Sequence, residues 1–189
     1  MRRIGILGDI GSGKSFVAKN FGYPVFNADY EVAKIYESDK RVFSKLKKLF
    51  PQYISSLPID KNEITKVILA RKSNLKKIIQ IIHKEVRKRM NIFIKKNKNQ
   101  KIIILDIPLL LENKINKKKD ILIFVDSKKK DILKRLVKRK NFNHKLLKKF
   151  KEIQFSTQYK KKQSNFIIHN NFEKKSVKRD IKKIIKKIL

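Results

Sequence analysis

Short apolar runs alternate with longer segments of helical spacing along this 189-residue chain. The runs have the length of buried β-strands, and glycine, proline, asparagine or aspartate bounds most of them. The predicted strands are 2–7, 23–27, 101–106, 120–126 and 165–169. Because strands that alternate with helices form parallel sheets covered by helices, the pattern predicts an α/β fold.

Between the predicted strands, apolar residues recur three or four positions apart, as they do in amphipathic helices. The predicted helices are 31–48, 61–71, 74–96, 128–139, 145–162 and 173–189, and a further one begins near residue 16. Asp60 and Asn74 are predicted N-caps, because short polar side chains can accept hydrogen bonds from the first N–H groups of a helix. Residues 60–99 therefore form a predicted all-helical insert between two strands.

A glycine-rich stretch directly follows the first predicted strand. Residues 8–15 read Gly-Asp-Ile-Gly-Ser-Gly-Lys-Ser and fit G-x-x-x-x-G-K-[ST], the loop that wraps nucleotide phosphates. Its glycines let the backbone aim N–H groups inward, and the helix that follows points its positive end at an anion. The predicted ATP- or GTP-binding residues of this loop are Gly11, Ser12, Gly13, Lys14, Ser15 and Phe16.

Two side chains at the end of the loop have separate predicted tasks. Lys14 can reach the β and γ phosphates as a point charge, and the Ser15 hydroxyl can bind Mg²⁺. Mg²⁺ is therefore the predicted cofactor, with ATP as co-substrate.

The chain is strongly basic, with 51 Lys and Arg against 16 Asp and Glu, a formal charge of +35. Such a charge suggests nucleic acid or an anionic surface as a partner. However, lysine is spread through every segment together with isoleucine and asparagine, residues of A/T-rich codons, and no nucleic-acid-binding motif is found. We therefore favour drift in base composition, and expect no dedicated nucleic-acid or membrane partner. The field should still attract polyanionic small substrates.

The chain has no cysteine, which excludes disulfides and thiolate metal sites. No long apolar signal precedes the first predicted strand, and no apolar run approaches the ~20 residues of a membrane-spanning helix. We expect a cytoplasmic monomer.

An ordered series of landmarks follows the phosphate loop: Asn27-Ala28-Asp29, His83, the segment from Asp106 to Glu112, Leu133-Lys134-Arg135 with Arg139, Gln154, and Ile167 to Asn170. Together they resemble the dephospho-CoA kinase family, which transfers the γ-phosphoryl group of ATP to the 3′-hydroxyl of dephospho-CoA in the last step of coenzyme A synthesis. The segment D-x-P-L-L-x-E is the most discriminating landmark. The resemblance covers essentially the whole chain.

The resemblance implies the P-loop NTPase fold, with a helical acceptor-binding insert and a lid. Residues 1–189 would form one kinase domain. Its core would comprise 1–59, 100–139 and 163–189, its insert about 60–99, and its lid about 140–162. The implied substrates are ATP and dephospho-CoA.

Four residues depart from the family's pattern. The family often has an aspartate in place of Asn27, a proline in place of Lys84, a glycine in place of Asp9 and a hydroxyl residue in place of Phe16. Asp9 matters most, because a carboxylate near phosphates is unfavourable unless it points away or meets Mg²⁺.

The resemblance also assigns catalytic roles. Asp29, expected at the carboxyl end of a strand, is the predicted base that accepts the proton of the acceptor hydroxyl; its alternative role is to cap a helix that begins at Tyr30. Asp106, also at a strand end, is predicted to hold Mg²⁺ through water. Arg139 is predicted to neutralise the transferring phosphate oxygens, or else to pair with the end of its own helix.

Further positions follow from the same resemblance. Residues 140–143 form a polar break that would suit a lid hinge. Lys149 and Lys160 match basic positions of the family, although both could be ordinary surface lysines.

Three residues are predicted to contact substrates. His83 is predicted on the acceptor side, and Glu112 either faces the acceptor or ties a strand end to the insert. Asn170 is predicted to meet the adenine end of ATP.

Two other readings stay open from sequence alone. A kinase of nucleoside monophosphates or shikimate would share the loop, lid and fold, because function depends on the acceptor site and not on the scaffold. An ATP-dependent RNA-binding module would give the charge a primary role.

Overall fold

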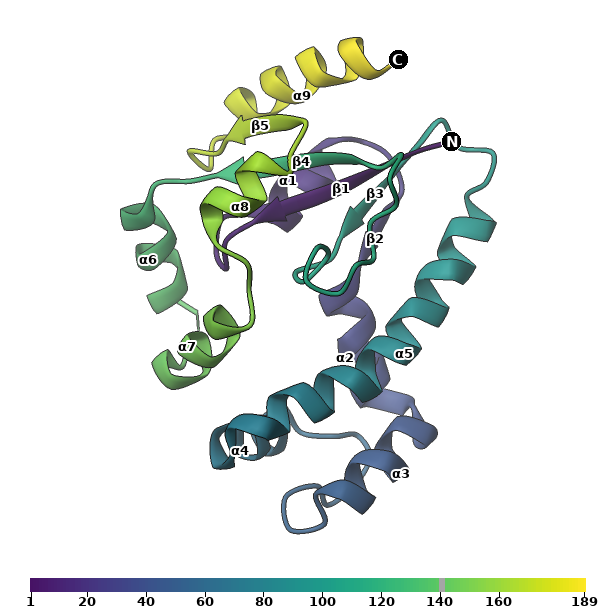
Figure 1. Ribbon diagram of the computed structural model, residues 1–189, viewed down its shortest axis with the longest axis vertical. Coiled ribbons are helices and arrows are strands. Elements are labelled where there is room, and N and C mark those ends of the chain that lie inside the picture. Colours follow the sequence, from purple (N-terminus) through teal and green to yellow (C-terminus); the bar gives the residue numbers. More distant parts are fainter. Residues whose placement is uncertain (140–141) are drawn as a thin grey trace. The chain divides into compact units, whose positions relative to one another are not determined.

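The computed structural model describes residues 1–139 and 142–189 (Figure 1). Within them, five strands form one sheet in the order β2-β3-β1-β4-β5. The strands are β1 Arg2–Gly8, β2 Val25–Asn27, β3 Ile102–Asp106, β4 Ile121–Asp126 and β5 Phe166–His169. Every neighbouring pair is parallel, which confirms the predicted α/β fold.

Helices separate most of the strands along the chain. They are α1 Lys14–Asn20, α2 Ala28–Ser38, α3 Lys40–Leu49, α4 Lys61–Ala70, α5 Lys72–Lys96, α6 Lys129–Val137, α7 His144–Glu152, α8 Thr157–Lys162 and α9 Lys174–Ile188. In the described part of the chain, no helix is both long and apolar enough to cross a membrane.

The chain divides into two compact units. The first contains residues 1–27, 97–142 and 153–189, and therefore holds the whole sheet with α1, α6, α8 and α9. The second contains residues 28–96 and 143–152, and therefore holds α2 to α5 and α7. The boundaries predicted above for core, insert and lid stay a prediction.

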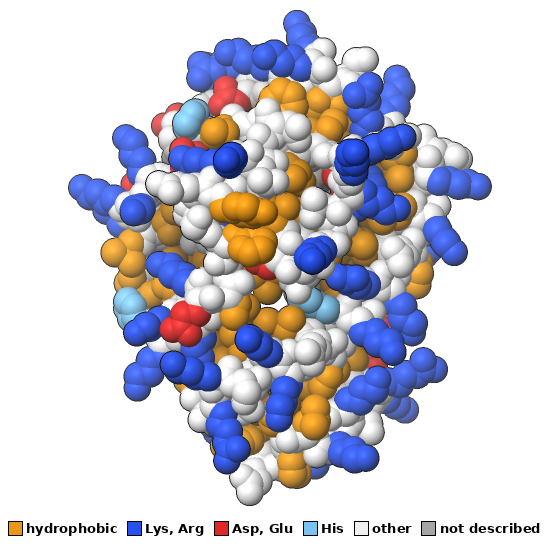
Figure 2. All heavy atoms as spheres, in the orientation of Figure 1, with side chains coloured by type: hydrophobic (Ala, Val, Ile, Leu, Met, Phe, Trp, Pro, Cys, Tyr) orange, Lys and Arg blue, Asp and Glu red, His pale blue; other side chains and the backbone are white. Residues whose placement is uncertain are grey.

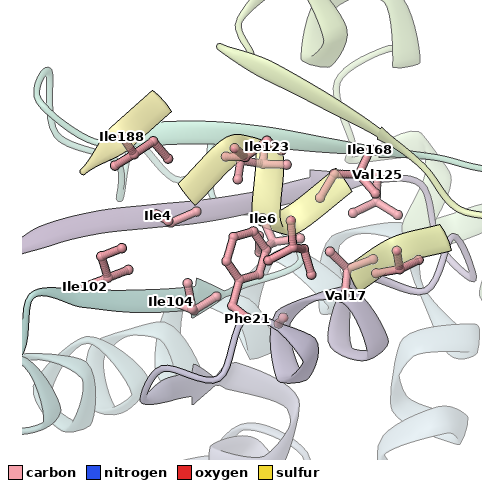
Figure 3. Packing of buried hydrophobic residues seen from close by; sticks show 14 residues of the cluster. Ile4, Ile6, Val17, Phe21, Ile102, Ile104, Ile123, Val125, Ile168 and Ile188 are labelled. Carbon is pink, nitrogen blue, oxygen red and sulfur yellow. The ribbon is translucent and has the colours of Figure 1, made fainter. Parts of the chain in front are cut away.

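The core of the first unit lies between the sheet and the helices α1 and α9. Figure 3 shows Phe21, just after α1, among isoleucines of the strands, with Val17 of α1 to one side; Ile188 of α9 belongs to the same cluster. The central strands β1, β3 and β4 carry near-continuous isoleucine, leucine and valine because both of their faces are buried, as is usual in parallel sheets.

The opposite face of the sheet is covered by the segment after β3. A Cβ atom on Gly5 would come within 2.5 Å of Leu110 and 2.9 Å of Leu122. No side chain larger than glycine fits there unless both leucines move. At the start of the same strand, Arg3 pairs with the buried carboxylate of Asp120 over 2.9 Å, which joins β1 to the residue before β4.

Two predicted helices are each broken in two. The predicted helix 31–48 becomes α2 and α3, because Asp39 adopts an extended conformation and accepts a hydrogen bond from the Val42 N–H over 3.0 Å. The predicted helix 145–162 becomes α7 and α8, and Ser156 caps α8 through the Tyr159 N–H over 3.2 Å. In both cases a polar side chain starts a new helix inside an apolar pattern.

Of the two N-caps predicted for the insert, one is confirmed and the other is wrong. Asp60 caps α4 as predicted, accepting from the Asn62 N–H over 2.8 Å. Asn74 does not cap α5, which begins earlier, at Lys72. Instead its buried amide donates to the Val67 carbonyl over 2.9 Å and ties α5 to α4.

In the second unit, one arginine joins three helices. Arg89 of α5 pairs with Glu31 of α2 over 3.2 Å, and lies 3.8 Å from Asp39 at the start of α3. Its Nε also lies 3.9 Å from Glu85 of its own helix.

Candidate active site

The candidate site lies at the carboxyl ends of the parallel strands. There the register pairs Gly8 of β1 with Val125 of β4, and Asn27 of β2 with Asp106 of β3. In open parallel sheets this is the edge where ligands bind. The glycine-rich loop connects β1 to α1 at the same edge.

The backbone of the loop has the conformation that its glycines predict. Gly11 and Gly13 have φ values of 86° and 88°, in the left-handed region that other residues rarely adopt. Gly13 is the N-cap residue of α1, and no side chain caps the helix there. An anion can therefore bind the first N–H groups of α1 in the place that a capping side chain would take.

Two side chains that directly follow β4 and β5 hold the loop in place. The Ser12 carbonyl accepts hydrogen bonds from Ser127 Oγ and Asn170 Nδ2, each over 2.8 Å. Asn170 is buried, and its Oδ1 accepts from the Phe172 N–H over 2.9 Å. Its amide is therefore used at both ends for structure. The predicted contact of Asn170 with adenine stays a prediction, and the structure adds a positioning role that sequence reasoning missed.

The predicted phosphate lysine lies over the start of its own loop. Lys14 Nζ donates to the carbonyls of Gly8 over 3.1 Å and Asp9 over 2.9 Å. These bonds hold the ammonium against the loop backbone.

A cluster of oxygen atoms lies next to the loop. Asn27 Nδ2 donates to Asp106 Oδ2 over 2.6 Å, and lies 3.4 Å from Ser15 Oγ. One amide group thus brings together the two residues predicted to hold Mg²⁺. A carboxylate in place of Asn27 would repel Asp106 unless a proton or cation lay between them, so asparagine suits this position without either.

The donor set fits magnesium. A serine hydroxyl and a buried carboxylate are hard oxygen ligands, and Mg²⁺ is usually held by one or two carboxylates together with substrate phosphates. Within the described ranges, no three His, Asp or Glu side chains come together as a metal cage. Ser15 and Asp106 would therefore bind the ion jointly with the nucleotide.

The carboxylate of Asp9 is bound by two side chains of α8. Its Oδ1 accepts from Lys160 Nζ over 2.9 Å, and its Oδ2 accepts from Thr157 Oγ1 over 2.8 Å. Burial by itself would raise the pKa of Asp9, but the hydrogen bonds from Lys160 and Thr157 and the charges of Lys160 and Lys14 together lower that pKa. Lys160 is buried and is not an ordinary surface lysine.

An arginine and an aromatic ring flank the other end of the loop. The Arg135 guanidinium lies over the ring of Phe172, with 4.1 Å between Cζ and the ring centroid. The same ring would lie 3.0 Å from a Cβ atom on Gly13. Phe172 has a positive φ of 67°. Sequence reasoning missed this pair, because no sequence motif marks either the contact between the guanidinium and the ring or the turn after β5.

Two predicted site residues belong to the second unit. Asp29 lies in the first turn of α2, two residues after the end of β2. Because α2 begins at Ala28, the alternative that Asp29 caps a helix beginning at Tyr30 is wrong. His83 lies on α5 and is partly exposed. The catalytic and acceptor-binding roles of these two residues stay predictions.

The remaining predicted residues lie near the ends of helices. Arg139 is exposed and directly follows Lys138, the C-cap of α6. Its backbone N–H donates to the Leu136 carbonyl over 3.1 Å. Residues 140 and 141 of the predicted hinge lie outside the described residues. Lys149 lies on α7, in the second unit.

Glu112 binds a segment that had not been expected as its partner. Its Oε1 accepts from the Phe155 N–H over 2.9 Å, which ties the turn after β3 to the residues before α8. A contact of Glu112 with the acceptor stays a prediction.

The family model for dephospho-CoA kinase matches residues 2–176. The dephospho-CoA kinase of Wolbachia sp. subsp. Brugia malayi (strain TRS) is 35% identical over 187 residues, which cover 96% of this chain and 95% of the relative. That of Fusobacterium nucleatum subsp. nucleatum is 33% identical over 175 residues, 89% of each chain.

Solved structures agree with the fold. TT1252 from Thermus thermophilus superposes with a TM-score of 0.77 at 23% identity, covering 100% of this chain and 98% of that one. A dephospho-CoA kinase from Campylobacter jejuni gives 0.63 at 21% identity, covering 99% and 97%. A shikimate kinase from Bacteroides thetaiotaomicron gives 0.55 at 11% identity, covering 99% and 98%.

Proposed function

The chain belongs to the dephospho-CoA kinase family, and we propose that it transfers the γ-phosphoryl group of ATP to the 3′-hydroxyl of dephospho-CoA. The products are ADP and coenzyme A. The observation that carries the proposal is the complete phosphate loop, with Lys14 held over it and Ser15, Asn27 and Asp106 beside it.

Phosphoryl transfer requires mainly positioning and neutralisation of charge, because its transition state spreads negative charge over the equatorial oxygens. The backbone of Gly11, Ser12, Gly13 and Phe16 binds the phosphates through N–H groups. Lys14 leaves the Gly8 and Asp9 carbonyls and follows the γ-phosphoryl group.

Ser15 and Asp106 would hold Mg²⁺, with Asn27 orienting the carboxylate of Asp106 through its 2.6 Å hydrogen bond. A bound ion would supply positive charge that offsets the negative charge of the nucleotide phosphates. Asn27 donates and does not compete for the ion, since its NH₂ group faces Asp106.

Asp29 is the residue that orients the acceptor hydroxyl and accepts its proton. It follows the end of β2 by two residues along the chain and lies in the first turn of α2. Arg139 neutralises the transferring oxygens with its fork of N–H donors. His83 and Glu112 contribute to binding of the acceptor. A cytoplasmic location and a monomeric state complete the proposal.

A substrate screen tests the proposal directly. The protein is incubated with Mg-ATP and either dephospho-CoA, adenosine, AMP or shikimate, and release of ADP is followed together with the mass of the product. Product is expected with dephospho-CoA, and a mass gain of one phosphate at its 3′ position identifies the reaction. The Lys14→Ala variant, purified in the same way, controls for contaminating kinases. A clear preference for AMP or shikimate would overturn the proposal.

A further inference from the structure

A buried lysine on α8 faces the phosphate loop. Lys160 is only 3% exposed. Among the described residues it is the only buried lysine. Its Nζ donates to Asp9 Oδ1 over 2.9 Å and lies 3.5 Å from Gln154 Oε1. Because a buried ammonium is costly unless it is paired, Asp9 is the group that makes this burial possible.

The negative charge of Asp9 is unfavourable in a phosphate-binding loop. It is the second residue of the loop motif, and a carboxylate there would repel the phosphates of a nucleotide. Its side chain is 34% exposed, so solvent screens it only in part. The geometry turns this carboxylate toward α8, where Thr157 holds its second oxygen over 2.8 Å.

The lowered pKa of Asp9 agrees with this arrangement. Burial by itself opposes ionisation, yet the hydrogen bonds and charge of Lys160, with smaller contributions from Thr157 and Lys14, more than offset it. Asp9 is therefore ionised at neutral pH. Together, Asp9 and Lys160 carry no net charge.

We propose that Lys160 is a positioning residue for phosphate binding: it neutralises Asp9 and holds that carboxylate away from the phosphates, so that a loop with an acidic residue can still bind ATP. Lys160 acts through Asp9 and does not itself bind the nucleotide. The inference rests on the proposed function in one respect, namely that the loop binds the phosphates of ATP.

A double-mutant cycle tests the inference. Wild type, Lys160→Met, Asp9→Asn and the double variant are compared by calorimetric titration with Mg-ATP and by urea unfolding. In Lys160→Met, the uncompensated carboxylate should weaken ATP binding by about 10- to 100-fold, and more strongly at low salt. In the double variant both charges are gone, so affinity should return to within about threefold of wild type.

Two further variants sharpen the cycle. Lys160→Arg keeps the charge and should retain most of the affinity. Lys162→Met removes an exposed charge from the same helix and should bind ATP like wild type. Asp9→Asn leaves a buried cation without its carboxylate, so it should unfold at lower urea than the double variant.

Three results would overturn the inference. A double variant as weak as Lys160→Met would show that Lys160 binds the phosphates itself. Unchanged affinity in Lys160→Met would show that Asp9 does not need its partner. Equal weakening in Lys160→Met and Lys162→Met would reveal only the general field of the protein.

Urea unfolding reports on folding, and the titration with ATP reports on binding, so the two effects can be told apart. If Lys160→Met does not fold, the unfolding midpoints of Asp9→Asn and the double variant still decide whether the pair is coupled. The titration with ATP needs no acceptor. A wild-type protein that shows the expected coupling but does not phosphorylate dephospho-CoA would therefore contradict the proposed function and leave this inference intact.

Discussion

Lys14 is the residue on which phosphoryl transfer depends most directly. We expect Lys14→Ala to raise the activation barrier by several kcal/mol, because its charge follows the moving phosphoryl group. The fold itself should hardly change, although loss of the charged hydrogen bonds from Nζ to the Gly8 and Asp9 carbonyls, each worth about 1.5–3 kcal/mol, should lower the stability of the protein. The measurement is kcat/KM for dephospho-CoA together with thermal unfolding.

Lys19→Ala is the matched control, because it removes an exposed lysine from the same helix. It should keep nearly full activity. If a folded Lys14→Ala protein also kept most of its turnover, the assignment of phosphoryl transfer to this loop would fail.

Asp29 tests the mechanism and not only nucleotide binding. Asp29→Asn preserves size while removing the proton acceptor, so kcat should fall by about 10²–10⁴-fold, or less if the loose transition state needs little deprotonation. The loss of a negative charge in the first turn of α2 should cost about 0.3–1 kcal/mol of stability. CoA formation across pH and ATP binding by calorimetry are measured together.

Glu31→Gln removes a charge from the same helical turn and serves as the control for that stability cost. It should lose stability, partly through its pair with Arg89, but keep its kcat. An Asp29→Asn variant that makes CoA within a few-fold of wild type would show that the base lies elsewhere, with Asp106 the next candidate.

At the scale of elements, the strands and the phosphate loop were predictable because their signals are local. Each strand is a short apolar run, every strand except β1 ends in a polar residue, and the loop is a motif of eight consecutive residues. The breaks at Asp39 and Ser156 were missed because the apolar spacing continues across both. In each case one capping hydrogen bond decides where the new helix begins.

Contacts between distant elements were not predictable from one sequence. Lys160 and Asp9 are 151 residues apart, and Asn170 and Ser12 are 158 apart. No periodicity in the sequence connects such distant positions. The residues that contact the phosphate loop could therefore be identified only from the structure. By contrast, Asn27 and Asp106 both end predicted strands, and their pairing across the edge of the sheet was within reach of the sequence.

The link between β5 and the phosphate loop gives a prediction at this scale. Asn170→Asp keeps the shape of the side chain but replaces its donor to the Ser12 carbonyl with a carboxylate oxygen. Stability should fall by about 1–3 kcal/mol, because a buried carboxylate oxygen would then face the Ser12 carbonyl with no hydrogen bond between them. The KM for ATP should rise in parallel, since only Ser127 would still donate to that carbonyl of the loop.

Urea unfolding and steady-state kinetics of Asn170→Asp separate the two roles considered for this residue. A raised KM for ATP with unchanged stability would indicate direct contact with the nucleotide instead. Asn171→Asp, at the exposed neighbouring position, controls for the added charge.

At the scale of the whole molecule, the charge of +35 is the most unusual property of the chain. Figure 2 shows Lys and Arg side chains scattered over the face in view, with few acidic side chains between them. A surface built for nucleic acid usually concentrates such charge in a patch or stripe. Lysine and arginine are also spread through every segment of the sequence, and this favours a general field that attracts anions over a dedicated RNA site.

This general field makes the salt dependence of the reaction a test of the alternative function. Between about 20 and 300 mM KCl the Debye length shrinks severalfold, so the KM values for ATP and dephospho-CoA should rise while kcat changes little. Mixed-sequence RNA should inhibit weakly at low salt, by competing as a polyanion, and lose this effect near physiological ionic strength. The measurements are initial rates across the salt range with and without RNA, and ATP turnover with RNA but no acceptor. Stimulation of that turnover by RNA at physiological salt would favour the ATP-dependent RNA-binding module, because a small-molecule kinase has no reason to couple ATP hydrolysis to RNA.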